Sequence, residues 1–422
     1  MKNCWERWRI CRKGKLVRKV CDLQGKTICC QTSQFRKPSP SGKVPSEREA
    51  ERVSKVGRKS STIVTAKKEK NKACPSLNTI VQYVKSYLRH PFRRPAAATF
   101  PEGEGCSRSH AEQWIGTFYE RQLSSCHLCP HHCHVNRTAG DLGFCGAGAL
   151  ARVALVSLHP WEEPCLVGKD GRGAGTVFFS HCNLCCCFCQ NHEISHDGHG
   201  IDVTDERLAE IFLEQQGRGA ATLDLVTPTH FAPQILHALA LAKARGFSLP
   251  VVWNSGAYET TALIDALTGS VDIYLPDLKY MDEASAREYS AAPDYFAAAS
   301  AAIERMFAQT GPAQFAPDGQ MTRGVLVRHL VLPGHRHESM RILDWLWEQF
   351  GDAIQVSLMN QYTPMYRAAE HRPLHRRLTT FEYESVVDHA LALGMTHCYT
   401  QERRAASEEY VPNFDGSGVT TQ

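Results

Sequence analysis

The sequence has no long apolar run and no apolar core near its start, and both absences narrow its class. No window approaches the roughly 18 apolar residues that a membrane-spanning helix needs, so no span is expected. The basic N-terminus also lacks a small-residue cleavage site, so no secretory signal is expected. We therefore expect a cytoplasmic protein, in which clustered cysteines are metal ligands or redox groups rather than disulfides.

Basic charge is scarce outside the N-terminal segment. The 422 residues carry a net charge of +4. Residues 1–72 hold 21 Lys and Arg against 6 Asp and Glu, or +15, which leaves −11 for the rest. With a net charge of −11, the residues after residue 72 offer no basic face for nucleic acid. Neither nucleic acid nor a membrane is therefore expected as a partner. Residues 1–105 have the composition of a disordered basic extension, with a nucleic-acid-binding arm as the alternative.

From about residue 174, short apolar runs alternate with helical patterns. The runs that predict strands are GTVFFS, TLDLVTP, LPVVWNS, VDIYLPD, VLVRHLVLP and IQVSLMN. Apolar runs of this length are typical of parallel strands covered on both faces. Thr204 and Ser339 are expected to cap two of the intervening helices. Six such units predict an α/β fold with a partial (β/α)6 barrel, in which ligands bind at the carboxyl ends of the strands.

Cysteine is crowded into one stretch, CNLCCCFCQN at residues 182–191. Cys182, Cys186 and Cys189 are spaced C-x3-C-x2-C directly after the first of these strands. Three thiolates on one loop can hold three irons of a [4Fe–4S] cluster and leave the fourth iron open. We assign these three as ligands in preference to a shifted set, and we interpret Cys185 and Cys187 as bystanders.

A second set of cysteines precedes the barrel. Its members are Cys126, Cys129, Cys133 and Cys145, spaced C-x2-C-x3-C-x11-C. Four such ligands on a short segment predict a closed site for zinc or for an auxiliary iron–sulfur cluster. A structural knuckle is favoured over electron transfer, because closed four-cysteine sites are usually structural. Neighbouring histidines can replace a cysteine, although we interpret them as surface residues: His127, His131, His132 and His134.

The triad is followed in order by LVTPTH, IYLPDLKY, LVRHLVLPG and MNQYTP. This arrangement resembles the radical S-adenosylmethionine (radical SAM) superfamily, and within it the uncharacterised pyruvate formate-lyase-activating-enzyme-like branch. The resemblance implies that a [4Fe–4S] cluster cleaves S-adenosylmethionine reductively and that the resulting 5′-deoxyadenosyl radical abstracts hydrogen from a substrate. It also implies an electron donor of the flavodoxin or ferredoxin type, and a substrate such as a glycyl-radical enzyme or another protein. Cys185 and Cys187 depart from the family, which has a basic residue and a small or branched residue there.

The resemblance also implies a binding site for the cofactor at the strand ends. Its residues are Thr227, Thr229, His230, Asn254, Ser255, Asp277, Lys279, Arg328 and Asn360. Within this set, the segment 227–230 is implied to contact the amino group of S-adenosylmethionine, Asn254 the ribose, and Arg328 the methionyl carboxylate. The histidine that the activators carry near Asn360 is absent.

The predicted organisation has four parts: a basic extension (1–105), a Cys-rich N-terminal module (106–172), a radical SAM core (173–375), and a C-terminal helix and tail packed on the core (376–422). The alternative to an enzyme is a non-enzymatic metal-binding or thiol redox-sensing protein on a radical SAM-like barrel. Binding of S-adenosylmethionine separates these two hypotheses.

Overall fold

The computed structural model describes residues 108–169, 171–401 and 412–420, together with the backbone of three strands near the N-terminus. These strands are β1 (Trp5–Cys11), β2 (Lys15–Cys21) and β3 (Thr27–Gln31), and they pair antiparallel in chain order. The other residues of the predicted extension 1–105, up to residue 107, lie outside the described residues. The disorder predicted for this extension, and the domain boundaries, therefore stay predictions.

All six predicted strands form, and they lie side by side in parallel. They are β5 (Ala174–Phe179), β7 (Leu223–Val226), β8 (Val251–Ser255), β9 (Ile273–Pro276), β11 (Met321–Leu330) and β12 (Gln355–Met359). The sheet continues in parallel through β13 (Cys398–Gln401) at one side. At the other side it continues in antiparallel fashion through β4 (Ala151–His159) and β6 (Ile201–Val203). A short strand, β10 (Gln314–Phe315), pairs antiparallel with β11 outside this order. The fold is thus mixed α/β, with a sheet dominated by parallel strands.

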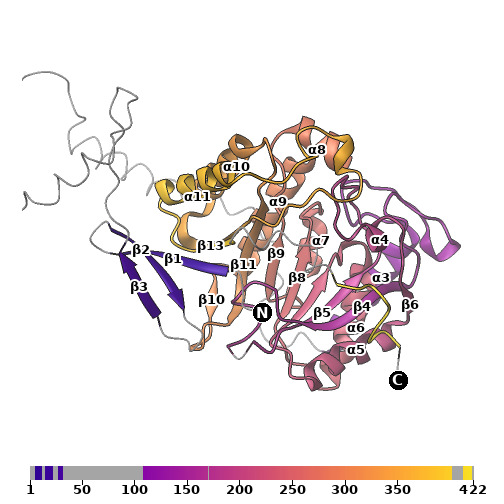
Figure 1. Ribbon diagram of the computed structural model, residues 1–422. Helices are drawn as coiled ribbons and strands as arrows, with labels where there is room; N and C mark the ends of the chain where they lie inside the picture. Colours follow the sequence, from indigo (N-terminus) through magenta and orange to yellow (C-terminus); the bar gives the residue numbers. More distant parts are fainter. Residues whose placement is uncertain are drawn as a thin grey trace, which may run out of the picture. The chain divides into compact units, whose positions relative to one another are not determined.

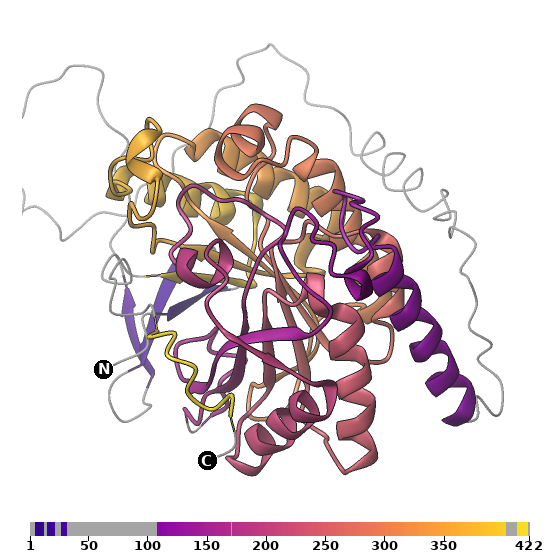
Figure 2. The same ribbon diagram turned by 90° about the vertical axis from the view of Figure 1, so that its right-hand side faces the viewer.

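Helices follow most of the parallel strands and lie around the outside of the sheet, as Figures 1 and 2 show. They are α3 (Arg108–Ser124), α4 (His192–Ser195), α5 (Asp205–Gly217), α6 (Ala232–Ala244), α7 (Thr261–Ala266), α8 (Glu283–Ser290), α9 (Tyr295–Thr310), α10 (Arg336–Phe350) and α11 (Thr380–Leu393). Thr204 caps α5 as predicted, because its side chain accepts the Arg207 N–H at 3.2 Å. In the described part of the chain, no helix is both long and apolar enough to cross a bilayer.

The start of α10 differs from the prediction. The helix begins at Arg336 with His335 as its N-cap residue, so Ser339 lies inside the first turn and is not the cap. The hydroxyl of Ser339 is instead 2.9 Å from Nε2 of the buried His329 on β11. A tertiary hydrogen bond therefore explains a serine that the local sequence pattern alone assigns to capping.

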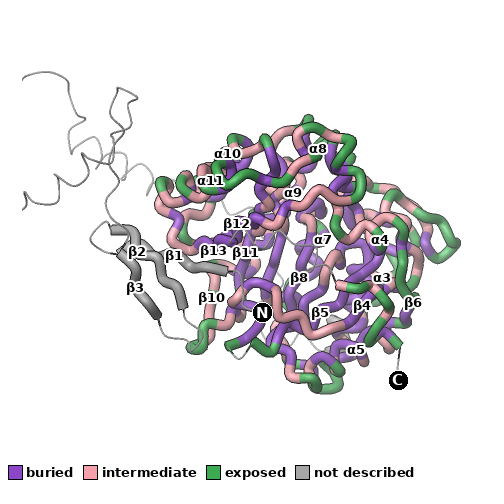
Figure 3. The backbone as a smooth tube through the Cα atoms, in the orientation of Figure 1, coloured by how far each residue is buried: buried purple, intermediate pink, exposed green. Residues whose placement is uncertain are grey.

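The two faces of the sheet pack against different partners. Side chains such as Trp253 and Tyr274 belong to the large core beneath the helices. Because neighbouring residues of a strand point to opposite faces, Val252 and Ile273 lie on the inner face. There they pack against Cys165 and Leu166, which belong to the loop between β4 and β5. This loop fills the interior, and Figure 3 shows the strands as largely buried.

The C-terminal residues 412–420 form a strap along β4. The Val156 N–H donates to the Ser417 carbonyl at 2.9 Å, and the Phe414 ring lies edge-on to Phe178, with 5.5 Å between centroids. Val419 is fully buried. The strap therefore packs against β4 and the core beside it.

A substitution at Gly418 should loosen this strap. Its φ is +75°, and an added Cβ would come within 2.6 Å of the Val156 carbonyl oxygen. We expect Gly418→Ala to lower the free energy of unfolding by about 1–3 kcal/mol, measured by chemical denaturation. Gly269→Ala is the matched control, because Gly269 has a similar φ of +77° but no atom within 4 Å of the added Cβ. Equal losses for the two variants would contradict the contact with β4.

Candidate active site

A cavity of about 280 Å³ lies at the carboxyl ends of the parallel strands. Most of the predicted site residues line it: Cys182, Cys186, Cys189, Thr227, Asn254, Ser255, Asp277, Lys279 and Arg328. They come from β8, from the segments that follow β5, β7 and β9, and from β11. The fold thus brings together residues that are up to about 150 positions apart in the chain, as expected for parallel strands whose carboxyl ends share one edge.

The cysteine loop after β5 forms one end of this cavity. Each of the three predicted ligands has a polar neighbour at its sulfur. The Leu184 N–H lies 3.4 Å from the Cys182 Sγ, the Ser290 hydroxyl 3.0 Å from the Cys186 Sγ, and the Ser195 hydroxyl 3.1 Å from the Cys189 Sγ. Hydrogen bonds of this kind to thiolate sulfur tune the reduction potential of an iron–sulfur cluster.

The two remaining cysteines of this loop do not line the cavity. Cys185 is exposed, and its Sγ lies 3.6 Å from Nδ1 of His196. Cys187 is buried, and its backbone is fixed by hydrogen bonds to Tyr289 and Arg367, each 2.8 Å long. The structure thus separates these two sulfurs from the cavity that Cys182, Cys186 and Cys189 line.

The three thiols suit a multi-iron cluster better than one ion. No group of three or more Cys, His, Asp or Glu side chains within the described ranges gathers as around a single metal ion. In a [4Fe–4S] cluster each thiolate binds a different iron, so the sulfurs need not converge on one point. Burial raises the pKa of Cys182 and Cys189, and that of Cys186 to about 11. Binding of a cluster there must therefore release protons.

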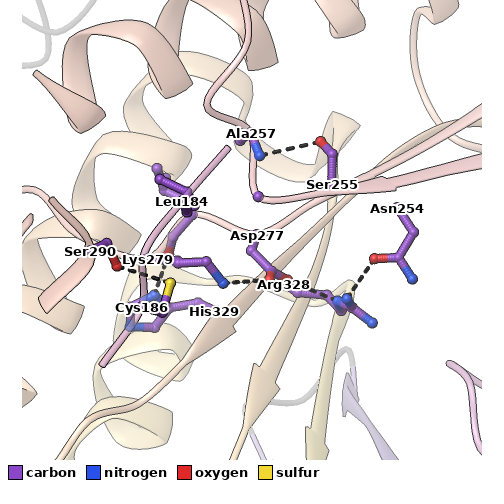
Figure 4. A network of polar contacts seen from close by, with 12 residues as sticks. Leu184, Cys186, Asn254, Ser255, Ala257, Asp277, Lys279, Ser290, Arg328 and His329 are labelled. Carbon is purple, nitrogen blue, oxygen red and sulfur yellow. Dashed lines mark hydrogen bonds and ion pairs between the residues drawn. The ribbon is translucent and has the colours of Figure 1, made fainter. Parts of the chain in front are cut away.

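A line of charged side chains leads away from the cysteines (Figure 4). The Lys279 ammonium donates to Asp277 at 2.6 Å, and Arg328 Nε donates to the other carboxylate oxygen at 3.0 Å. Arg328 Nη2 then donates to the Asn254 side-chain oxygen at 2.7 Å. Burial acts to raise the pKa of Asp277, but the charges of Lys279 and Arg328 outweigh it and hold that pKa below its usual value. Asp277 is therefore ionised and fixes both cations.

Two further carboxylates, which the sequence analysis did not assign, line the cavity beside Arg328. Its Nη1 atom lies 3.5 Å from Glu162 Oε2 and 3.9 Å from Glu163 Oε2. Burial raises the pKa of Glu163 to about 8; the charge of Arg328 opposes this rise and that of Glu162 adds to it. The strand-end rule missed both residues, because they lie in the loop before β5. The only signal in the sequence was the acidic pair itself, within EEPC.

Glu259 is another residue that the sequence analysis missed. Its buried carboxylate accepts hydrogen bonds from the Thr229 hydroxyl, the Trp253 indole N–H and the Ser255 hydroxyl, at 2.7 to 2.8 Å. The Ser255 hydroxyl also accepts the Ala257 N–H at 3.2 Å. Glu259 thus orients the turn after β8 that borders the cavity.

Three predicted binding residues lie outside the cavity lining. Thr229 faces Glu259, and His230 Nε2 lies 2.8 Å from the Ser180 carbonyl oxygen. Burial lowers the pKa of His230 to about 3, so its ring is neutral. The Asn360 N–H donates to the Gln401 side chain at 2.8 Å, although the next residues, Gln361 and Tyr362, do line the cavity.

The second cysteine set surrounds a separate, smaller cavity of about 10 Å³. Its lining includes Cys126, Cys129, Cys133 and Cys145, together with Thr229 and His230. The guanidinium of the buried Arg137 donates to the Cys126 Sγ at 3.2 Å, and its other amino group donates to the His230 carbonyl. Of the four nearby histidines, only His132 lines this cavity.

Comparison with known proteins places the chain in a family through a curated relative, although no family model matches the chain. It is 31% identical over 276 residues to Uncharacterized protein MJ0674 of Methanocaldococcus jannaschii, a match that covers 63% of this chain and 74% of that protein. The chain belongs to the family of that protein.

Two solved structures are also similar in part. One is Streptococcus suis SuiB, with a TM-score of 0.36 and 13% identity over 54% of this chain and 48% of that chain. The other is native anSMEcpe with bound AdoMet, with a TM-score of 0.37 and 10% identity over 50% and 57%. The chain thus spans about half the length of these two proteins. Likenesses with TM-scores below 0.5 assign neither fold nor function.

Removal of the Glu163 charge should make stability less dependent on pH. A carboxyl group whose pKa is raised on folding keeps a proton in the folded protein that it releases in the unfolded chain. Its contribution to the free energy of unfolding is therefore complete below the pKa of the unfolded chain, and it is lost as the pH rises through about 8. We therefore expect the melting temperature of Glu163→Gln to rise relative to that of the unaltered protein as the pH increases from 5 to 8. A difference that stays constant in calorimetry over this range would contradict the raised pKa.

Proposed function

We propose that this member of the MJ0674 family is a radical SAM enzyme. It binds a [4Fe–4S] cluster through Cys182, Cys186 and Cys189, cleaves S-adenosylmethionine reductively, and abstracts hydrogen from a substrate. One observation carries the proposal: the three sulfurs with the 3-then-2 spacing share one cavity with the charged strand-end residues, and Cys185 and Cys187 do not line it. The resemblance of these same segments to the superfamily supports it further.

The residues at the cysteine end fit such a cluster, because three thiols with donors at their sulfurs meet at one buried end of a cavity. When bound there, the cluster would supply the electron for reductive cleavage of S-adenosylmethionine, whose radical fragment abstracts the hydrogen. Lys279 is the cation near Cys186, and it is positioned by Asp277. It can neutralise charge at the cluster and the methionyl carboxylate.

We propose a more restricted role for Arg328 than the resemblance implies. Its guanidinium donates to Asp277 and Asn254 and faces Glu162. Binding of the methionyl carboxylate by Arg328 would have to compete with these anionic partners. We propose that Lys279 is the main contact for that carboxylate, and that Arg328 holds Asn254 and Asp277 in position around the ribose and the cluster.

One part of the cavity wall is aromatic and would shield a radical from solvent there. Phe178, Phe179 and Phe188 line the cavity and are buried, and Pro412 of the C-terminal strap lines it as well. A low-polarity wall protects a reactive radical from side reactions with solvent. The strap therefore contributes to the reaction chamber as well as to stability.

The finer features of the assignment are proposals too. We propose that the second cysteine set holds a structural metal, because closed four-cysteine sites are usually structural. We also propose a cytoplasmic enzyme of the pyruvate formate-lyase-activating-enzyme-like branch, served by a flavodoxin- or ferredoxin-type donor. A protein substrate, such as a glycyl-radical enzyme, fits that branch.

Formation of 5′-deoxyadenosine tests the proposed activity. The protein is purified without oxygen, reconstituted with iron and sulfide, reduced with dithionite and mixed with S-adenosylmethionine. We expect an iron–sulfur spectrum and time-dependent release of 5′-deoxyadenosine and methionine. A reconstituted and reduced cluster that neither binds nor cleaves S-adenosylmethionine would contradict an enzyme and favour the thiol-sensing alternative.

The ligand assignment predicts two classes of cysteine variant. Cys182→Ala, Cys186→Ala and Cys189→Ala should each lose the triad cluster, because each removes a ligand from a set of three. Cys185→Ala and Cys187→Ala are the matched controls from the same loop and should retain it. Iron and sulfide content and the absorbance of the reconstituted proteins are the measurements. Loss of the cluster in either control would overturn the assignment.

A further inference from the structure

The cavity has an acidic end that the proposed chemistry does not use. Glu162 and Glu163 line it from the loop between β4 and β5, and only 9% and 1% of these residues are exposed. Pro164 follows them, and the next residues, Cys165 and Leu166, are packed in the inner core. The two carboxylates are therefore fixed at the cavity wall and are not mobile surface groups.

Carboxyl groups outnumber cations around this end. Four carboxyl groups and two cations share the region. Glu162, Glu163 and Asp224 are buried, and Asp277, Lys279 and Arg328 are partly buried. Asp277 takes the close contacts from both cations, at 2.6 and 3.0 Å. The nearest approach of Arg328 to Glu163 is 3.9 Å, which is too long for a hydrogen bond. Asp277 thus takes the short contacts of both cations, and Glu162 and Glu163 are left with Arg328 at 3.5 and 3.9 Å.

Glu163 also lacks hydrogen-bond donors. Among the residues that the structure describes, neither of its buried carboxylate oxygens has a hydrogen-bond partner, and Oδ1 of Asp224 has none either. A buried carboxylate without donors is costly, by roughly 1–3 kcal/mol or more for each unmet group. Such groups either hold a proton or await a positively charged ligand. Because Glu162 and Glu163 border an open cavity, a ligand can reach them.

The acidic end is distinct from the cysteine end. The charged neighbours of Cys186 are Lys279 and Asp277, whereas those of Glu163 are Arg328 and Glu162. The contacts run in sequence from Lys279 through Asp277 and Arg328 to the glutamates. The two glutamates therefore lie at the opposite end of this series of contacts from Lys279 and Cys186.

We propose that Glu162 and Glu163 bind a positively charged amino or guanidino group of the substrate. The inference rests on the proposed function and defines its substrate class: a small amine or guanidine, or a lysine- or arginine-like side chain of a peptide. An ammonium or guanidinium supplies the N–H donors that Glu163 lacks and favours the ionised form of its carboxyl group. Arg328 separates this group from Asp277 and keeps the substrate cation away from the cysteine end.

Binding of model cations to the reconstituted protein tests this inference. The probes are 1,5-diaminopentane and agmatine, with 1,5-pentanediol as the neutral analogue, titrated by calorimetry in the presence of S-adenosylmethionine. We expect both cations to bind and the diol not to bind. Glu162→Gln and Glu163→Gln should each weaken cation binding at least tenfold. Glu210→Gln should leave it unchanged, because Glu210 is an exposed partner of Arg207 on α5 outside the cavity.

Several outcomes would overturn the inference. These are failure of both cations to bind, equal binding by Glu163→Gln and the unaltered protein, or a tenfold loss of S-adenosylmethionine affinity in Glu163→Gln. The last would assign the acidic end to S-adenosylmethionine itself. Melting temperatures verify that the variants fold, which is expected because each removes a buried charge. The two proposals can also fail independently. Cation binding that depends on the glutamates, in a protein that forms no 5′-deoxyadenosine, would support the acidic subsite and contradict the radical SAM assignment.

Discussion

The Asp277 carboxylate, placed between Lys279 and Arg328, is the interaction on which the charge arrangement of the cavity depends. It holds one cation toward the cysteine loop and the other toward Asn254 and the glutamates. Without Asp277, two buried cations would lie side by side without their shared partner, which is unfavourable in a low-dielectric interior. One carboxylate at the end of β9 therefore divides a single cavity into two chemically different ends.

The sequence predicted the parallel part of the fold well, because buried parallel strands are uniformly apolar and separated by clear helical patterns. It did not predict β4, β6 and β13. β13 reads Cys398–Gln401, with too little apolar character to indicate a strand, and its place in the sheet comes from pairing with β12. β4 lies within the predicted Cys-rich module, yet it pairs with the first barrel strand. β4 is itself a strand-like apolar run, ARVALVSLH, whereas the short β6 and β13 carry little local signal of their own.

The candidate site was predictable where residues follow strands. That rule found Asp277, Lys279 and the cysteine triad, which do line the cavity. It failed to separate neighbours along one turn: Thr227 reaches the cavity, but Thr229 turns to Glu259. The direction of a side chain in an irregular turn depends on backbone angles, such as the positive φ of 58° at Thr227, which spacing does not reveal. The rule also cannot find Glu162 and Glu163, which enter the cavity from the loop before a strand.

We propose that one cavity holds an iron–sulfur cluster at its cysteine end and S-adenosylmethionine beside Lys279 and Asp277. Anomalous diffraction at the iron edge, from anaerobic crystals of the reconstituted protein with S-adenosylmethionine, tests it most directly. The account predicts iron bounded by Cys182, Cys186 and Cys189, with S-adenosylmethionine in the same cavity. Iron bound through Cys185 or Cys187, or S-adenosylmethionine outside this cavity, would contradict it.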